Sequence, residues 1–460
     1  IVQSGCARHP FDRMAQKTMD IPNGKIANLG DRISNLPDEL LHHVMSFLPA
    51  RDAVPTCVLS PRWRFLWVSA RCLNVDAKGY SKRQFVQFVT TLLLRRGCTP
   101  LDSFWLRASW PIIFLNDLEN TANDWICHAL RSNVQVLGIV EQDEDIEYEE
   151  EEEEEVEAED MEVGKDLAFR LNHYPFTSSY LKRLHLCFVS IDNQLTTRLF
   201  SGCQALEDLE MINCSIYATE FSSGTLKNLT IDYVGLPLRE RHGNKHDIAI
   251  NMPSLVLLRI GALLCKMPSL VVGHSLRIAS LTLDHPSVTY ADACGILGAL
   301  STVKNLELLF PNDAALLKSS LQSDMQLCRV VFPNLTTLSL SDWCLHGNCK
   351  ALLYLLRHSP NLEKLTLKMR KVTIFTILWH SGFESYIGFY DNLDWFPSAA
   401  AERDSPCKER EIPFNCDNLK KIEIICPEGD KRVSMLVAIL FGRISSPEEI
   451  SIKPFSGSSW

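Results

Sequence analysis

The feature that most constrains this chain is a short apolar unit that recurs along most of its length. The unit reads apolar-x-x-apolar-x-apolar, and eleven segments between Leu101 and Ile424 fit it. They begin at residues 101, 134, 181, 206, 226, 255, 278, 303, 335, 362 and 419. From 181 onward the spacings are 25, 20, 29, 23, 25, 32, 27 and 57 residues. Most of these lie in or near the period of about 20–29 residues that is typical of solenoid repeats with one strand per unit.

Such units predict an α/β solenoid. Each unit exposes one apolar face, and stacking the units buries these faces in a continuous core under a curved parallel sheet. Amphipathic stretches between the units, at 115–132, 291–300 and 350–358, are expected to form helices of the outer surface.

Strand alternation decides which side chains of each unit remain accessible. The apolar positions turn inward, and the residues between them turn to the concave face. That face is polar, mixed in charge and varied, which suits recognition of another protein. The candidate binding residues on it are Trp105, Arg183, His185, Asp208, Glu210, Arg259, Glu307 and Lys364.

A second feature precedes the repeats, in the stretch Leu36–Trp67. Pro37 and Pro49 delimit one predicted helix, and two more are expected at Asp52–Leu59 and Pro61–Val68, followed by a longer one at Tyr80–Gly97. A region of about 40 residues cannot bury a self-sufficient core, so these apolar helices must dock on something.

The residues of this stretch resemble an F-box, and more narrowly the F-box of plant F-box/leucine-rich-repeat proteins. The resembling segments are Leu36–Leu41, Ser46–Pro49, Val58–Ser60, Arg62-Trp63 and Leu66-Trp67. The resemblance implies an N-terminal three-helix F-box followed by a leucine-rich-repeat solenoid. It also implies that the F-box binds a Skp-type adaptor and so joins a cullin-based ubiquitin ligase, while the repeats hold a target protein.

By the same resemblance, one face of the F-box is the adaptor site. We expect this outward face to consist of Leu36, Pro37, Leu40, Leu41, Val44, Leu59, Trp63 and Leu66. For Leu48 and Trp67 a place in the small internal core is the alternative.

The expected layout is a disordered tail at 1–30, the F-box at 31–76, the repeats at 77–412 and a terminal cap at 413–460. The cap reads strand, turn, helix, strand and resembles the FBD region of the same plant proteins. Two insertions interrupt the repeats, an acidic one at 141–163 and an aromatic one at about 373–412. The aromatic insertion suits either a partner-binding lid or a segment without settled structure.

The acidic insertion explains the net charge of −10. Residues 141–162 hold sixteen acidic side chains, so the rest of the chain has 46 basic against 56 − 16 = 40 acidic residues. The repeat spacing of 47 residues across this run becomes 25 when its 22 residues are subtracted. We therefore interpret it as a solvated loop within one repeat.

Motifs for chemistry are absent from the sequence. It contains no glycine-rich phosphate loop, no G-x-S-x-G and no H-E-x-x-H. Its sixteen cysteines include no Cys-x-x-Cys, and the close pair Cys344 and Cys349 lacks a second pair. We expect no catalytic residue, metal or cofactor, no nucleic-acid or membrane partner, and buried thiols in the cytoplasm or nucleus.

Two alternatives to the ligase adaptor stay open at this point. One is a leucine-rich-repeat protein-interaction scaffold outside any ligase, in which the F-box helices only cap the solenoid. The exposure of Leu40, Leu41 and Trp63 distinguishes these two readings. The other is a small-molecule receptor, by resemblance to a subset of plant F-box/repeat proteins, although no pocket signature is present.

Overall fold

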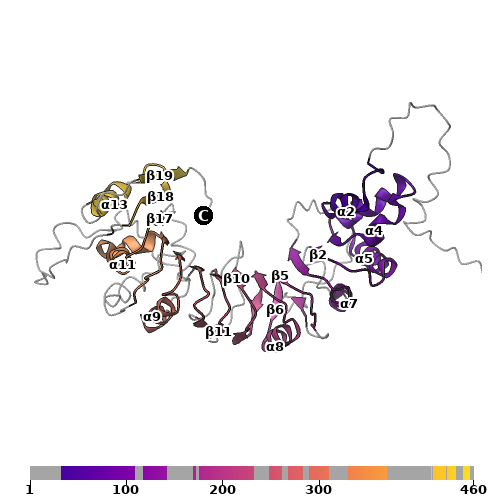
Figure 1. Ribbon diagram of the computed structural model, residues 1–460, viewed down its shortest axis with the longest axis horizontal. Helices are drawn as coiled ribbons and strands as arrows, with labels where there is room; N and C mark the ends of the chain where they lie inside the picture. The colour runs from indigo at the N-terminus through magenta and orange to yellow at the C-terminus, as the bar shows by residue number, and fades with distance from the viewer. Residues whose placement is uncertain are drawn as a thin grey trace, which may run out of the picture. The chain divides into compact units, whose positions relative to one another are not determined.

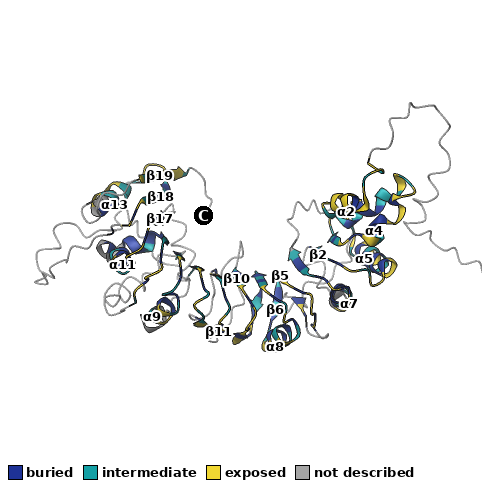
Figure 2. Ribbon diagram, in the orientation of Figure 1, coloured by how far each residue is buried: buried dark blue, intermediate teal, exposed yellow. Residues whose placement is uncertain are grey.

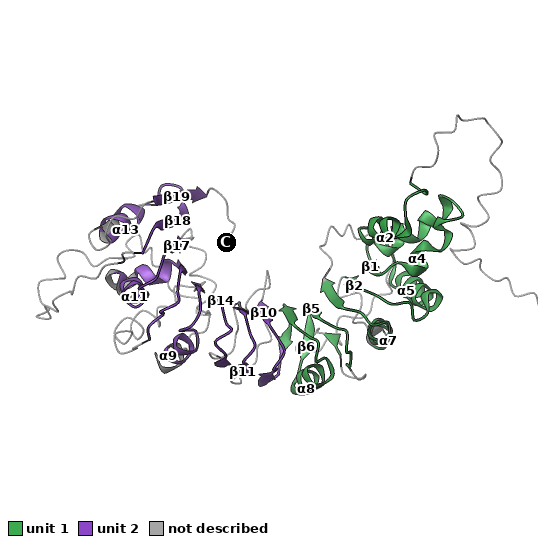
Figure 3. Ribbon diagram, viewed as in Figure 1, with its two compact units in different colours: residues 1–215 green, residues 216–460 purple. Residues whose placement is uncertain are grey.

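A computed structural model of the chain gives two compact units, residues 1–215 and 216–460 (Figures 1 and 3). The residues that it describes are 33–108, 118–141, 169–171, 176–232, 248–261, 268–282, 290–309, 330–369, 416, 418–430, 432–441 and 449–455. The tail predicted at 1–30, the acidic insertion after Glu141 and the aromatic insertion lie outside these residues.

Unit 1 opens with three helical segments, as the sequence predicted. They are α2 (Asp38–Ser46), α3 (Ala50–Ala53) continued by the 3-10 helix η1 (Val54–Val58), and the 3-10 helix η2 (Trp63–Phe65) continued by α4 (Leu66–Ser69). Pro37 and Pro49 stand directly before α2 and α3. The second segment corresponds to the helix predicted at Asp52–Leu59, but it begins at Ala50 and changes to 3-10 geometry at Val54. Pro55 offers no backbone N–H, and the chain accommodates it in the first turn of η1.

The main strands of unit 1 run parallel, each beside the next repeat's strand. They are β1 (Cys72–Asp76), β2 (Ser103–Ala108), β3 (Val136–Glu141), β5 (Arg183–Cys187) and β7 (Asp208–Ile212). Two short strands, β4 (Phe169–Arg170) and β6 (Val189–Ile191), also pair in parallel, and β8 (Ser215–Ile216) ends the unit. The helices between strands are α5 (Lys82–Arg96), α7 (Leu118–Arg131) and α8 (Asn193–Gly202).

Side chains at the helix starts explain two of these boundaries. Ser81 and Gln84 form a reciprocal capping box at α5, and Asp192 accepts a hydrogen bond from the Leu195 amide at α8, at 2.7 Å. Each satisfies backbone N–H groups that the first helical turn leaves without a partner.

Unit 2 continues the same plan. Its main strands are β10 (Asn228–Asp232), β12 (Leu257–Ile260), β14 (Ile278–Thr282), β15 (Asn305–Leu309), β16 (Thr337–Ser341), β17 (Lys364–Lys368), β18 (Lys421–Pro427) and β19 (Glu449–Phe455). A second parallel sheet contains β9 (Glu220–Ser222), β11 (Ala249–Met252) and β13 (Ser269–Val272). Its helices are α9 (Tyr290–Ala299), η6 (Asp342–Leu345), α11 (His346–Arg357) and α13 (Arg432–Phe441).

The core of each unit is made by the apolar positions of the repeat. In β7, β10, β14 and β15 buried and half-buried residues alternate strictly. The buried members form a ladder across strands, as in Leu306, Leu338, Leu365 and Ile422, which are successive register partners. Figure 2 shows this dark-blue core and, by contrast, the yellow exposed residues of α2. None of the described helices combines the length and apolarity needed to cross a bilayer.

The strand register corrects one repeat boundary. The unit predicted to start at Ile278 starts two residues earlier, at Leu276, because Ala279 pairs with Leu258 on one side and Leu306 on the other. Leu276 is buried, as the first apolar position should be. The central apolar position of this repeat is occupied by the small residue Ala279, so the sequence pattern did not reveal where the repeat begins.

The strands that flank each predicted insertion are direct neighbours in the sheet. β3 pairs directly with β5, and β17 pairs directly with β18. Sequence reasoning also missed β1, whose buried Leu73 and Val75 follow the repeat pattern within the segment assigned to the F-box. The F-box helices therefore lead into the first strand without a linker.

Arg96 fastens the F-box helices to the first repeat. This buried side chain reaches from α5 and donates hydrogen bonds to the carbonyls of Trp67 and Ala70, both at 2.6 Å. Burial lowers the pKa of Arg96 to about 10, so the guanidinium stays charged at neutral pH. It satisfies carbonyl groups at the end of α4 that would otherwise be buried without a partner.

We expect Arg96→Met to lower the free energy of unfolding by roughly 2–4 kcal/mol, because two buried carbonyls lose a charged donor. Urea denaturation followed by circular dichroism measures this. Arg83→Met is the matched control, since Arg83 lies exposed on the same helix. Equal stability of the two variants would contradict the anchoring role of Arg96.

Candidate functional site

Helix α2 presents apolar side chains on two different faces. Leu41 and Met45 are 0% and 1% exposed, whereas Leu40, Val44 and Phe47 are 48%, 44% and 72% exposed. The exposed set has the spacing i, i+4, i+7, which places it on one stripe of a helix. The first set fills the core of this helical region, and the second is not covered by any element in the described part of the chain.

Neighbouring segments carry further exposed apolar side chains. Of the thirteen large hydrophobic residues that are exposed in the described part of the chain, seven come from residues 33–65. We call this set the outer apolar face, and it consists of Ile33, Leu40, Val44, Phe47, Val58, Leu59 and Phe65. Concentration of exposed apolar groups in so short a stretch is typical of a protein-binding surface.

The structure corrects part of the predicted adaptor face. Pro37, Leu40, Val44 and Leu59 are exposed and Leu36 is half-buried. The prediction that Leu41, Trp63 and Leu66 face outward is wrong, since all three are buried. Adjacent residues on a helix point about 100° apart, so Leu40 and Leu41 cannot share a face. Trp67 is buried, as its alternative core assignment required, whereas Leu48 is only half-buried.

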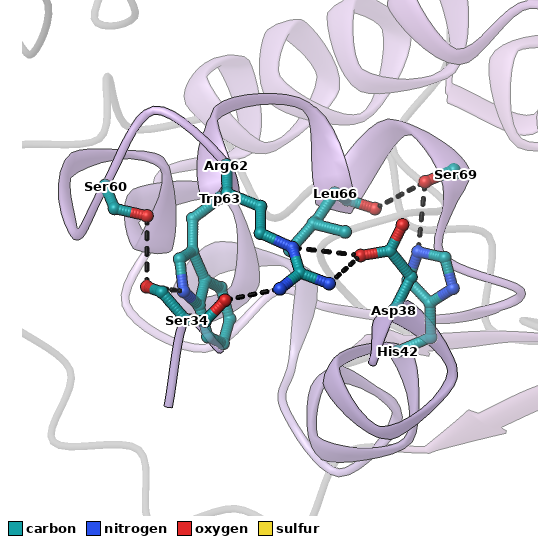
Figure 4. A network of polar contacts seen from close by, with 8 residues as sticks. All are labelled: Ser34, Asp38, His42, Ser60, Arg62, Trp63, Leu66 and Ser69. Carbon is teal, nitrogen blue, oxygen red and sulfur yellow. Dashed lines mark hydrogen bonds and ion pairs between the residues drawn. The ribbon is translucent and has the colours of Figure 1, made fainter. Parts of the chain in front are cut away.

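A polar network fixes the buried tryptophan of this region (Figure 4). The indole N–H of Trp63 donates to Ser34 Oγ at 2.9 Å, and Ser34 Oγ lies 3.0 Å from Ser60 Oγ. Trp63 thereby buries its ring and still satisfies its N–H. The segment that enters α2 is held against the segment that enters η2.

An ion pair also connects the segments that enter α2 and η2. Arg62 Nη2 lies 2.6 Å from Asp38 Oδ1, and Arg62 Nη1 donates to the carbonyl of Ser34 (Figure 4). His42 Nε2 lies 3.0 Å from Ser69 Oγ, which links α2 to α4. Because the ion pair is exposed, it contributes little stability, and its main effect is to fix the angle between the helices.

A second candidate surface lies on the polar face of unit 1, which consists of the half-exposed alternate residues of its main strands. Trp105, Gly138, His185 and Glu210 are successive register partners on β2, β3, β5 and β7. The ring centroids of Trp105 and His185 are 5.0 Å apart, and His185 Nδ1 lies 2.5 Å from Glu210 Oε2. The fold therefore brings three of the predicted binding residues into contact.

The other predicted residue pair of unit 1 flanks this row. Arg183 and Asp208 are register partners, with Arg183 exposed and Asp208 half-buried. Sequence reasoning missed Gly138, where a Cβ atom would overlap the indole ring of Trp105. It also missed Arg107, although the period of two places that residue on the same face of β2 as Trp105.

On the polar face of unit 2, lysine side chains bind the carboxylates of Glu307 and Glu423. Glu307 accepts hydrogen bonds from Lys368 at 2.7 Å, Ser280 at 2.7 Å and Ser339 at 3.2 Å. Burial alone would raise the pKa of Glu307, but these hydrogen bonds outweigh burial and lower it. Of the two other predicted residues, Arg259 is exposed on β12 and Lys364 bonds to Glu423.

Glu423 is the more strongly perturbed of the two. It pairs with Lys453 and with Lys364, the latter at 2.9 Å. The hydrogen bonds from Lys453 and Lys364 lower the pKa of Glu423 to about 2. The lysine side chains, more than the protein interior, cover this carboxylate, so hydrogen bonding and not desolvation controls its pKa.

No cluster for metal binding emerges from the described residues, where no three His, Cys, Asp or Glu side chains converge. Cys344 and Cys349 are buried. Burial raises the pKa of the Cys203 thiol to about 11, and it raises that of Cys344 as well. These thiols are packed in the core as small apolar groups.

The first surface lies in a segment that matches a known domain family. Residues 33–74 match the F-box domain family. An F-box/LRR-repeat protein of Arabidopsis thaliana is 29% identical over 264 residues, which are 53% of this chain and 64% of that relative. A second such protein of the same plant is 26% identical over 379 residues, covering 74% of this chain and 54% of the relative. The chain thus spans less than two thirds of the length of these two relatives.

A third relative extends the similarity. An F-box/FBD/LRR-repeat protein of Arabidopsis thaliana is 27% identical over 357 residues, which are 74% of this chain and 78% of that protein. With the fold, these findings define a chain that has an N-terminal F-box domain and a leucine-rich-repeat α/β solenoid. It is similar to plant F-box/LRR-repeat proteins, and the resemblance and fold class predicted from its sequence are confirmed.

The contribution of Glu423 and its two lysine partners to the stability of the fold should depend on pH. A depressed pKa means that the carboxylate stabilises the fold above its ordinary pKa of 4.5, and that this stabilisation is lost as pH falls toward about 2. We expect Glu423→Gln to lower the melting temperature at pH 7 and to differ progressively less from wild type below pH 4.5.

Thermal unfolding of both proteins across this pH range is the measurement. Glu363→Gln is the control, because the Glu363–Lys420 pair is exposed and 3.7 Å long and should contribute almost nothing. A Glu423→Gln difference that is constant with pH would show that the carboxylate charge is unimportant.

Proposed function

We propose that this chain is the substrate-recognition subunit of an SCF-type cullin ubiquitin ligase. Its F-box binds a Skp-type adaptor, and its repeats bind a target protein. The observation that carries the proposal is the outer apolar face, which the chain's own fold leaves exposed in the segment that matches the F-box domain. An adaptor that covers this face would remove apolar surface from water, which is the main driving force of association.

The proposed mechanism is proximity. A subunit that holds the target beside the ubiquitin-charged enzyme raises the effective concentration of the target's lysines. The chain itself then needs no catalytic group, and we propose that it is not an enzyme. The repeat strands suit the second binding step, since Trp105, His185 and Glu210 form a preassembled group on the polar face of unit 1.

The alternative is a protein-interaction scaffold in which the F-box helices only cap the first repeat. The Arg96 hydrogen bonds and the burial of Leu41 and Trp63 support a capping role. These contacts explain only the inner face of the F-box helices, which contains the buried residues Leu41 and Met45. Exposure of Leu40, Val44 and Phe47 favours a partner outside the chain. Buried thiols such as Cys203 suit a reducing compartment, so we place the proposed complex in the cytoplasm or nucleus.

The test is binding of the full chain to a purified Skp-type adaptor. We expect Leu40→Ala/Phe47→Ala to weaken binding at least about tenfold, because both side chains would be buried at the interface. Both are exposed in the chain alone, so its melting temperature should change little. Leu94→Ala removes a leucine that is even more exposed but lies outside the outer apolar face, and this variant should bind as wild type does.

If a folded wild-type chain does not bind the adaptor, the ligase assignment is refuted and the protein-interaction scaffold is the remaining hypothesis. Equal weakening by Leu94→Ala and by the double variant would show that the outer apolar face is not the contact.

A further inference from the structure

The guanidinium group of Arg107 is held in place on the polar face of unit 1. Its Cζ atom lies 5.6 Å from the centroid of the Trp105 ring, and its Nε donates a hydrogen bond to Asn74 Oδ1 at 3.2 Å. Asn74 belongs to β1 and Arg107 to β2. An aromatic ring and an amide from the neighbouring strand therefore fix the orientation of a long side chain that would otherwise rotate freely.

The position of the Trp105 ring depends on a glycine. Gly138 is the register partner of Trp105, and a Cβ atom there would overlap Cε3 and Cζ3 of the indole. The absence of a side chain lets the ring lie across β3 and approach His185, which is held in turn by Glu210. We call Asn74, Arg107, Trp105, His185 and Glu210 the arginine–tryptophan row.

The part of this row that is available to a ligand is the pair of Nη nitrogens of Arg107. Within the described residues, neither Nη nitrogen of Arg107 has a hydrogen bond or an ion pair, whereas Arg62, Arg71 and Arg432 each pair with an aspartate. Arg107 is half-buried, and neither of its Nη nitrogens is among the buried, unpartnered side-chain atoms of the described residues. A guanidinium group in a fixed orientation matches the two oxygens of a carboxylate.

Charges around the row limit the kind of anion that fits. Asp76 is the register partner of Arg107, and its carboxylate accepts a hydrogen bond from the Lys78 amide. Asp208 and Glu210 lie on β7, with Glu210 beside His185. These carboxylates would repel a polyanion such as nucleic acid, but they leave room for one negative charge directed at Arg107.

We propose that the arginine–tryptophan row is the anchor for an aspartate or glutamate side chain of the target protein. The carboxylate binds the Nη nitrogens of Arg107, and residues next to it pack on Trp105. Because Trp105 and Asn74 already order the guanidinium, binding costs little side-chain entropy. Tryptophan and arginine are also the residues that most often dominate binding energy at protein interfaces. This inference rests on the proposed role of the repeats in target binding.

The experiment measures retention of the full chain on immobilised short peptides with random flanks and a fixed central residue. We expect peptides with central glutamate to retain wild type about tenfold better than peptides with central glutamine, as a charge-assisted hydrogen-bond pair implies. Arg107→Gln should abolish the preference and Arg107→Lys should reduce it, since lysine lacks the fork. Gly138→Val should also abolish it by displacing the Trp105 ring.

Arg71→Gln is the matched control, because Arg71 is an exposed arginine of unit 1 that already pairs with Asp102 at 2.6 Å. It should keep the wild-type preference. The melting temperature of each variant shows whether it folds, and Arg107→Lys keeps the test informative if Arg107→Gln does not.

Equal retention on glutamate and glutamine peptides, or a preference that survives in folded Arg107→Gln, would overturn the proposal. Displacement of the peptides by millimolar free glutamate as effectively as by soluble glutamate peptide would also overturn it, in favour of a small carboxylate ligand. Adaptor binding measured on the same samples separates the two hypotheses. If the peptide preference is absent while adaptor binding is intact, only the proposed role of the arginine–tryptophan row is refuted. If the peptide preference is present while adaptor binding is absent, only the ligase assignment is refuted.

Discussion

The ladder of buried aliphatic side chains across the parallel strands is the interaction on which this structure depends. No single repeat can bury its apolar face, so each strand needs the next one, as the partners Leu306, Leu338 and Leu365 illustrate. A regular ladder also aligns the residues between the apolar positions. It is this alignment that sets Trp105 beside His185 and Glu307 near Lys368, although these partners come from different repeats.

The same constraint explains why the F-box helices have two apolar faces. The inner face, with Leu41 and Met45, completes their own small core, and Arg96 joins that core to the first repeat through the end of α4. The outer face contains Leu40, Val44 and Phe47, which remain exposed among the residues that the structure describes. A helix that served only as a cap would need the first face alone. The second face is the physical basis for assigning an external partner to this domain.

Sequence periodicity predicted the fold class, the repeat strands and the three helical segments, because these follow from local patterns of apolar residues. Helical spacing separates Leu40 from Leu41, but it could not tell which of the two turns to the core, since both are equally apolar and only packing distinguishes them. It placed one repeat two residues late, where Ala279 occupies an apolar position. The contacts of Arg107 and Gly138 depend on the register between strands 33 residues apart in sequence, as the pair Asn74 and Arg107 shows, and no single-strand pattern contains that information.

The central claim is that one face of the F-box helices holds the solenoid while the other docks an adaptor. Hydrogen–deuterium exchange of the full chain, with and without a purified Skp-type adaptor, tests it most directly. The claim predicts slower exchange in α2 and in the segment from Val58 to Phe65 when adaptor is present, with β2 to β7 unchanged. Unchanged exchange throughout the F-box helices, or protection confined to the repeat strands, would contradict it.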